Sequence, residues 1–156
     1  MAINAALDRQ IASLLANAPT DFATQLAVQA IAPVLKTIGL RLRHPRYFII
    51  QDLKHNHWAV SSLRHRHLSG LTKNVAYAYS DRQDANQERL KQAPEHSTCA
   101  ELELIFLLFQ FVSMKELDSL ILFEQPHHLN QGTELVRLEI QQLWEAQVQK
   151  LRQHLA

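Results

Sequence analysis

The chain has 156 residues, enough for one hydrophobic core and too few for two comfortable domains, so we expect a single domain over 1–156. Its hydrophobic fraction of 47%, charged fraction of 20% and net charge of +1 are ordinary for a globular protein and point to no strongly charged partner. The longest apolar stretch, LIFLLFQFV at 104–112, is about half of the roughly 20 residues that a membrane helix needs. We therefore expect no membrane span.

The cysteine content and the N-terminus favour a cytoplasmic location. The chain contains a single cysteine, Cys99, so it cannot form an internal disulfide, which suits a reducing compartment. The opening MAINAALDRQIASLL lacks the basic segment and apolar run of a signal peptide.

Two helices are predicted before residue 40. Apolar residues at helical spacing predict the first at about 3–16. The second is predicted over 21–38, with Thr20 as its N-cap and Gly39 as its C-terminal stop. Pro33 should kink this helix, because proline cannot donate to the carbonyl four residues back.

Three strands are predicted after these helices. Aromatic and β-branched residues predict strands at 46–53, 57–65 and 75–80. The first two would be joined by a tight turn of His55 and Asn56, in which Asn56 takes a positive φ. This turn would pair residues whose numbers sum to 111.

The second half of the chain mixes helices and strands. Ser80 and Gln83 form a capping-box pattern that predicts a short polar helix over 81–92. Residues 97–124 are ambiguous between two strands and a strand, helix, strand order; we favour the latter, with a strand near 98–103, a buried helix near 104–115 and a strand at 119–124. A long amphipathic helix is predicted from Thr133 to the end.

These elements predict an α+β fold. We expect a mainly antiparallel sheet of about four to five strands, two N-terminal helices and a long C-terminal amphipathic helix. At the level of the fold only, the order of elements resembles small secretion-chaperone-like binding folds, which implies a binding module.

Two His-x-His pairs lie in HNHWAVSSLRHRH, residues 55–67. His57 and His65 would be roughly 26 Å apart on one strand, at about 3.3 Å per residue, whereas zinc ligands lie about 2 Å from the metal. The predicted turn would instead bring His44, His65 and His67 together. Nearby arginines disfavour a dication there, so we expect no stoichiometric zinc and no metal site.

The same region predicts a basic surface for an anion. Residues 1–79 carry nine Lys/Arg and three Asp/Glu (9 − 3 = +6), and residues 80–156 carry seven and twelve (7 − 12 = −5). Two interpretations of a hairpin over 41–73 with such a charge remain open: a solvated basic surface, which we favour for most of its residues individually, and a surface that binds nucleic acid or another polyanion. The candidate anion-binding residues are Arg41, Arg43, His44, Arg46, Arg64, His65, Arg66 and His67.

Candidates for catalysis are few. Cys99 follows His96, but it begins an apolar segment and is expected to be a buried, inert thiol. Asp118 and Glu124 flank a predicted strand that is followed by two histidines, which we interpret as ordinary polar flanks. With three glycines and no catalytic motif, the sequence indicates no catalytic residue and no cofactor.

The C-terminal helix carries more apolar residues than one docking face needs. Its main stripe, predicted to face the sheet, comprises residues 136, 140, 143, 144, 151 and 155. Leu135 and Leu138 fall outside it, and together with Trp144 they are the predicted interface residues. Our leading hypothesis is therefore a non-enzymatic protein-interaction or assembly/chaperone-like module that forms a homodimer; the alternative is a nucleic-acid- or other polyanion-binding protein that uses the basic hairpin.

Overall fold

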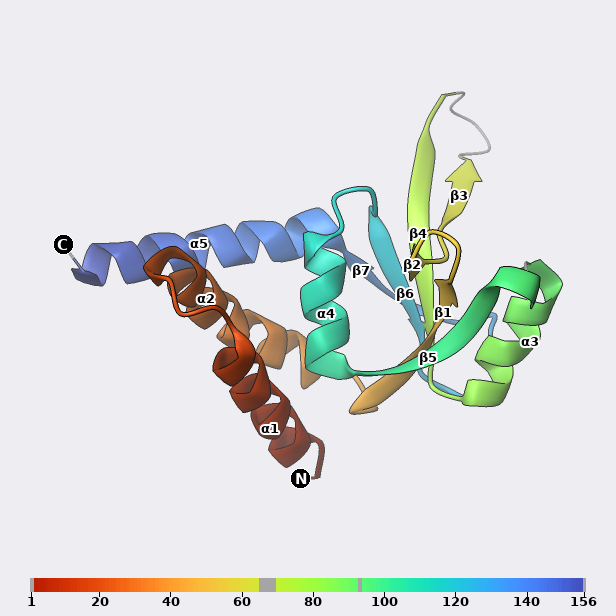
Figure 1. Ribbon diagram of the computed structural model, residues 1–156, viewed down its shortest axis with the longest axis horizontal. Coiled ribbons are helices and arrows are strands. Elements are labelled where there is room, and N and C mark those ends of the chain that lie inside the picture. The colour runs from red at the N-terminus through yellow and green to blue at the C-terminus, as the bar shows by residue number, and fades with distance from the viewer. Residues whose placement is uncertain (1, 65–69, 93, 156) are drawn as a thin grey trace. The chain divides into compact units, whose positions relative to one another are not determined.

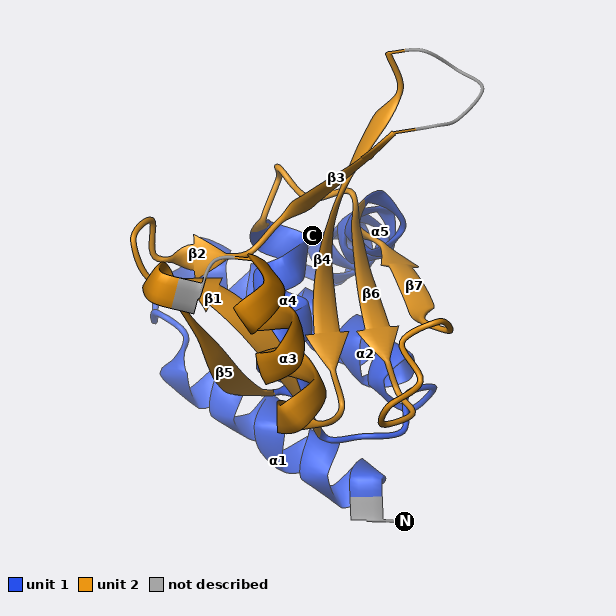
Figure 2. Cartoon of the chain, turned by 90° about the vertical axis from the view of Figure 1, so that its right-hand side faces the viewer, with its two compact units in different colours: residues 1–45, 103–113, 138–156 blue, residues 46–102, 114–137 orange. Residues whose placement is uncertain are grey.

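The computed structural model describes residues 2–64, 70–92 and 94–155, which form an α+β structure (Figure 1). The chain contains two compact units (Figure 2). Unit 1 comprises residues 1–45, 103–113 and 138–156, and unit 2 comprises residues 46–102 and 114–137. No helix within the described ranges is long and apolar enough to cross a membrane. That 1–156 folds as one domain stays a prediction.

Unit 1 consists of helices. They are α1 (Ala2–Asn17), α2 (Phe22–Gly39), α4 (Leu104–Ser113) and nearly all of α5 (Arg137–Leu155). The helices α1, α2 and α4 pack against one another, and each contributes side chains that water does not reach, such as Leu7, Ile31 and Leu108. The two N-terminal helices and the long C-terminal helix are therefore confirmed.

The ends of α2 differ from the prediction. Its N-cap is Asp21, not Thr20, and the Asp21 carboxylate accepts a hydrogen bond of 3.0 Å from the backbone N–H of Thr24. Gly39 is the last residue of the helix rather than a stop beyond it. A Cβ atom at Gly39 would lie 3.0 Å from the Leu7 side chain, so the glycine allows close contact between α2 and α1.

Unit 2 is built on a sheet. Its order is β2-β1-β4-β6-β7, with β3 paired to β4 and β5 paired to β1. The strands are β1 (Arg46–Asp52), β2 (His57–Trp58), β3 (Ser61–Arg64), β4 (Thr72–Tyr79), β5 (Ser97–Glu103), β6 (Ser119–Phe123) and β7 (Thr133–Val136). Antiparallel pairs join β1 to β2 and β4, β3 to β4, and β6 to β7, while β4 and β6 are parallel. The mainly antiparallel sheet is confirmed, but it has seven strands in the described residues instead of the four to five predicted, and β4 and β6 form a parallel pair.

The predicted strand 57–65 is two strands. His57–Trp58 pairs with β1, whereas Ser61–Arg64 pairs with β4. The β1–β2 register joins Asp52 to His57, so the turn has four residues, 53–56, and the predicted two-residue turn was wrong. Asn56 does take the expected positive φ, 54°.

The ambiguous middle of the chain follows the strand, helix, strand order that we favoured, as β5, α4 and β6. The C-terminal helix starts later than predicted, because Thr133–Val136 forms the edge strand β7 on β6. Arg137 fixes this boundary. It is buried, its backbone N–H donates to the Asp118 carbonyl and its Nε donates to the Leu117 carbonyl at 2.8 Å.

The polar helix α3 (Arg82–Gln92) is also confirmed, but its cap is not Ser80. The Asp81 carboxylate accepts the hydrogen bond from the Gln83 backbone N–H at 2.7 Å. The Ser80 hydroxyl is buried and has no hydrogen-bond partner within the described part of the chain. Asp is as good an N-cap as Ser, so the sequence pattern does not separate the two neighbours.

A buried glutamine joins three segments of unit 1. Gln10 of α1 donates through Nε2 to the Pro45 carbonyl at 2.9 Å, and its Oε1 accepts from the Ile105 backbone N–H at 2.9 Å. The first N–H groups of a helix have no partner within the helix, and Ile105 is the second residue of α4. Gln10 thus provides an acceptor for the buried Ile105 N–H, which has no acceptor within its own helix.

We expect Gln10→Met to lower the free energy of unfolding by about 1–3 kcal/mol, because methionine fills the same space and leaves the buried Ile105 N–H unpaired. Urea unfolding measures the change. The control is Gln29→Met, at an exposed position of α2, which should change stability by no more than about 0.5 kcal/mol. Equal midpoints for the two variants would show that the Gln10 hydrogen bonds are dispensable.

Candidate functional site

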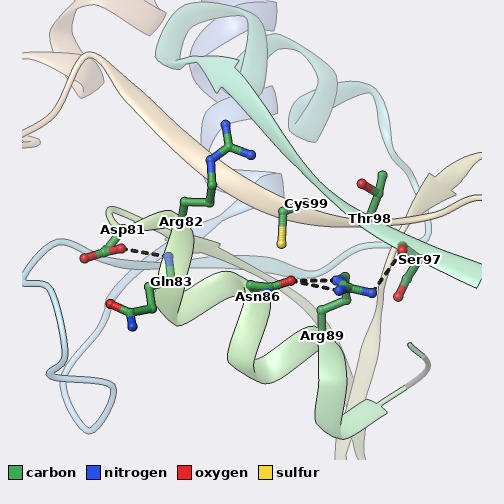
Figure 3. Close-up of a pocket in the computed structure, with 8 residues that line it drawn as sticks. All are labelled: Asp81, Arg82, Gln83, Asn86, Arg89, Ser97, Thr98 and Cys99. Carbon is green, nitrogen blue, oxygen red and sulfur yellow. Dashed lines mark hydrogen bonds between the residues drawn. The ribbon is translucent and has the colours of Figure 1, made fainter. Parts of the chain in front are cut away.

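A polar cavity of about 640 Å³ lies between α3 and β5 in unit 2 (Figure 3). Figure 3 shows the Cys99 thiol pointing from β5 toward α3. The lining residues are Asp81, Arg82, Gln83, Asn86, Arg89, Ser97, Thr98 and Cys99. This volume is within the range of small-molecule sites, and its polar lining suits a polar ligand.

Two arginines of this cavity are held in place. Arg82, Asn86 and Arg89 are spaced i, i+4, i+7, so they share one face of α3. Arg89 donates through Nε and Nη2 to the Asn86 side-chain oxygen, at 3.0 and 2.8 Å, and through Nη1 to the Ser97 carbonyl at 3.3 Å. The Arg82 guanidinium lies 4.9 Å from the Phe48 ring centroid and 3.6 Å from a Glu101 oxygen. An anionic ligand would meet two oriented cations here, and also the repulsion of Glu101.

Cys99 lies where the sequence predicted an apolar environment. It is half-buried and packs against a buried cluster that includes Ile50, Tyr79 and Phe123. Its thiol also lines the polar cavity, so the structure does not show the fully buried thiol that the sequence predicted.

His127 has different carboxylate partners from those considered in the sequence. Its Nδ1 lies 2.8 Å from Asp84 Oδ1, and its backbone N–H donates to Asp84 Oδ2 at 2.7 Å. Asp81 Oδ2 is 3.6 Å from its Nε2. The two carboxylates near His127 in sequence have other partners. Asp118 accepts a hydrogen bond from the Asn74 N–H, and Glu124 accepts one from the Tyr47 hydroxyl. The buried Asp84 carboxylate therefore links α3 to the loop that follows β6.

A second group of metal-ligating side chains lies at the turn between β1 and β2. It contains Asp52, His55 and His57. Sequence reasoning considered these histidines only as part of a four-histidine set and did not include Asp52. The signal that could have found it is the D-x-x-H-x-H spacing across a turn.

The predicted anion-binding residues fall in different parts of the chain. Arg46 lies 3.6 Å from Glu101, which partly neutralises it. Arg64 is the last residue of β3 and pairs with Thr72, not with β1. Arg41, Arg43 and His44 follow α2 in unit 1, whereas His65, Arg66 and His67 lie outside the described residues. Binding of a polyanion at 41–73 stays a prediction.

Lys73, another cation of that region, is paired. Its ammonium donates to Glu134 Oε2 on β7, which also accepts from the Ser119 hydroxyl at 2.6 Å. These two hydrogen bonds lower the pKa of Glu134 below its ordinary value of 4.5, and the bond from Lys73 has the larger effect. Because the pKa of this carboxyl is lower in the folded than in the unfolded state, its ionised form stabilises the folded state at pH values above the ordinary pKa. This contribution is lost as the pH falls through the folded-state pKa.

We therefore expect Glu134→Gln to be less stable than the wild type at neutral pH, by up to about 1 kcal/mol for an exposed pair. The difference should begin to shrink as the pH falls below about 4.5, where the unfolded state protonates, and should disappear below the lower pKa of Glu134 in the folded state. Thermal midpoints across this range test the prediction, with the exposed Glu139→Gln as control. A difference that stays constant with pH would exclude the ion pair as its cause.

Unit 1 carries an apolar groove of about 320 Å³. Its floor and walls come from α1, α2 and α4, and its apolar members include Leu14, Val28, Phe106 and Phe109. Its polar members are Gln10, Ser13, Asn17, Thr24 and Glu103. Phe106 is 46% exposed, unusual for a phenylalanine in a highly apolar helix. An apolar groove with a polar rim is suited to apolar side chains from another molecule.

The predicted interface residues have different environments. Leu138 is 56% exposed on α5, as expected for a residue outside the docked stripe. Leu135 is half-buried on β7, opposite Leu120, so its placement on the helix was wrong. Trp144 is half-buried; its Nε1 donates to the Ala27 carbonyl at 2.9 Å and its ring centroid lies 6.4 Å from that of Phe109. Leu143, predicted on the buried stripe, is exposed.

Comparison with known protein families gives no match, and comparison with curated proteins gives none either.

Proposed function

We propose that this protein is a non-enzymatic interaction module, and that unit 1 holds apolar side chains of a partner's amphipathic helix in the α1–α2–α4 groove. The groove is the observation that supports this proposal. A buried cavity of about 150 Å³ accommodates benzene, so about 320 Å³ has room for two large apolar side chains. Helices recognised in grooves insert such anchors at i, i+3 or i+4.

Charge at the rim suggests the chemistry of the partner. Glu103 is the charged residue among those that line the groove. A partner helix with lysine or arginine beside its apolar anchors would complement this carboxylate, and charge complementarity favours association and selects partners. We further propose a cytoplasmic location, because a chain with one cysteine gains nothing from an oxidising compartment.

The test uses a labelled synthetic helix of leucine and lysine, about 18 residues and five turns long, and a matched helix of leucine and glutamate. Fluorescence anisotropy should show binding of the Leu–Lys helix only. Phe106→Ser should weaken this binding about tenfold or more, because it removes an exposed apolar wall without adding charge.

The matched control is Leu63→Ser, which removes a side chain of similar exposure, 43%, from β3 in unit 2. It should bind as tightly as the wild type. Equal binding by Phe106→Ser and Leu63→Ser would refute groove binding, and a preference for the glutamate helix would refute the charge argument.

The exposed Leu138 makes a separate prediction about self-association. If two copies pair through α5, Leu138→Glu should convert a dimer into a folded monomer, because it places a charge on an apolar contact. Multi-angle light scattering measures the mass, and circular dichroism verifies the fold. Leu90→Glu on α3, with 54% exposure of the leucine, is the control that should remain dimeric. A monomeric wild type at high concentration would refute the homodimer and leave the groove proposal standing.

A further inference from the structure

The turn between β1 and β2 brings three metal-ligating side chains together. One ligand atom from each of Asp52, His55 and His57 lies within 4.8 Å of the other two. Asn56, with its φ of 54°, reverses the chain between the two histidines. Their rings stack with centroids 5.4 Å apart and an interplanar angle of 15°. The turn therefore presents both imidazoles side by side.

The two imidazoles have different oxygen neighbours. His57 Nδ1 lies 2.9 Å from the Trp58 carbonyl, and His55 Nδ1 lies 2.9 Å from Asp52 Oδ2, whose carboxylate belongs to the same group of ligands. Because a carbonyl can only accept, His57 Nδ1 carries the proton and the neutral ring has its lone pair on Nε2. Metal-binding histidines are often oriented as His57 is, by an acceptor on the nitrogen that does not bind the metal. His57 is thus in a tautomer whose Nε2 lone pair can bind a metal ion.

The Asp52 carboxylate is fixed at the base of the turn. Its Oδ1 accepts from the backbone N–H groups of Lys54 and His55, at 2.9 and 3.3 Å. This position places a carboxylate oxygen, a common ligand of transition-metal ions, beside the two imidazoles.

The structure assigns to this turn a site for one divalent transition-metal ion, bound by Asp52, His55 and His57. Two imidazoles and one carboxylate suit Zn²⁺, Cu²⁺, Ni²⁺ or Co²⁺ and not Mg²⁺ or Ca²⁺, which prefer oxygen. All three side chains are at least partly exposed, so water can complete the coordination. This proposal departs from the sequence-based expectation of no metal site, which considered the two His-x-His pairs and the group of His44, His65 and His67 but not Asp52.

The group formed by Asp81, Asp84 and His127 is the internal control. In that group the Asp84 carboxylate is buried and binds His127 through both oxygens, whereas Asp52 is partly exposed to water. Isothermal titration of chelator-treated protein with Zn²⁺ should show a site that His57→Gln weakens at least tenfold and that His127→Gln leaves unchanged. Unchanged binding in His57→Gln, or no binding by the wild type, would overturn the assignment.

A proximity measurement locates the ion independently. The chain has two tryptophans, and Trp58 adjoins His57. Cu²⁺ quenches nearby indole fluorescence, so one equivalent should quench Trp144→Phe, in which Trp58 remains. An absence of quenching in Trp144→Phe, or quenching that survives His55→Gln in the same background, would place the ion elsewhere and refute the proposal. Circular dichroism verifies that each variant is folded.

Discussion

The parallel pairing of β4 with β6 is the constraint on which the rest of the structure depends. It joins five residue pairs, from Val75 opposite Ser119 to Tyr79 opposite Phe123. Parallel neighbours cannot be joined by a hairpin and need a crossover of a dozen or more residues. Here the chain places α3, β5 and α4 between the two strands. The polar cavity is built from α3 and β5, and α4 contributes Phe106 to the groove, so both surfaces are consequences of this crossover.

Buried polar side chains fix which segments meet within each unit. Gln10, Asp84, Ser119 and Arg137 are buried, and each has a hydrogen-bond partner at least 15 residues away in sequence. An apolar contact tolerates a shift of register, whereas a buried donor without its acceptor costs about 1–3 kcal/mol. These four residues therefore select one arrangement among the many that would bury the same apolar area.

Site residues were harder to predict than elements, because their partners are distant in sequence. His127 was noted beside Asp118 and Glu124, but it pairs with Asp84, 43 residues earlier. The distance between the two His-x-His pairs was calculated for one continuous strand. The structure contradicts this assumption, because the strand is broken between Trp58 and Ser61. Asp52 was missed because the predicted turn had two residues. In the four-residue turn of the structure, the Asp52 carboxylate lies beside the His55 ring.

The sequence by itself determined what depends on local pattern. Apolar spacing predicted α1, residues typical of helix ends predicted α2, composition predicted β1 and β4, and Asn56 predicted the positive φ of its turn. The helix α4 and the strand β6 belong to the favoured interpretation of an ambiguous segment. Only the tertiary structure decided the parallel pair, the split of residues 57–65 and the addition of β7 to the sheet edge. The physical reason is the range of the interactions. A helix satisfies its backbone with neighbours four residues away, whereas a strand finds its hydrogen bonds on another strand, which a short window of sequence does not contain.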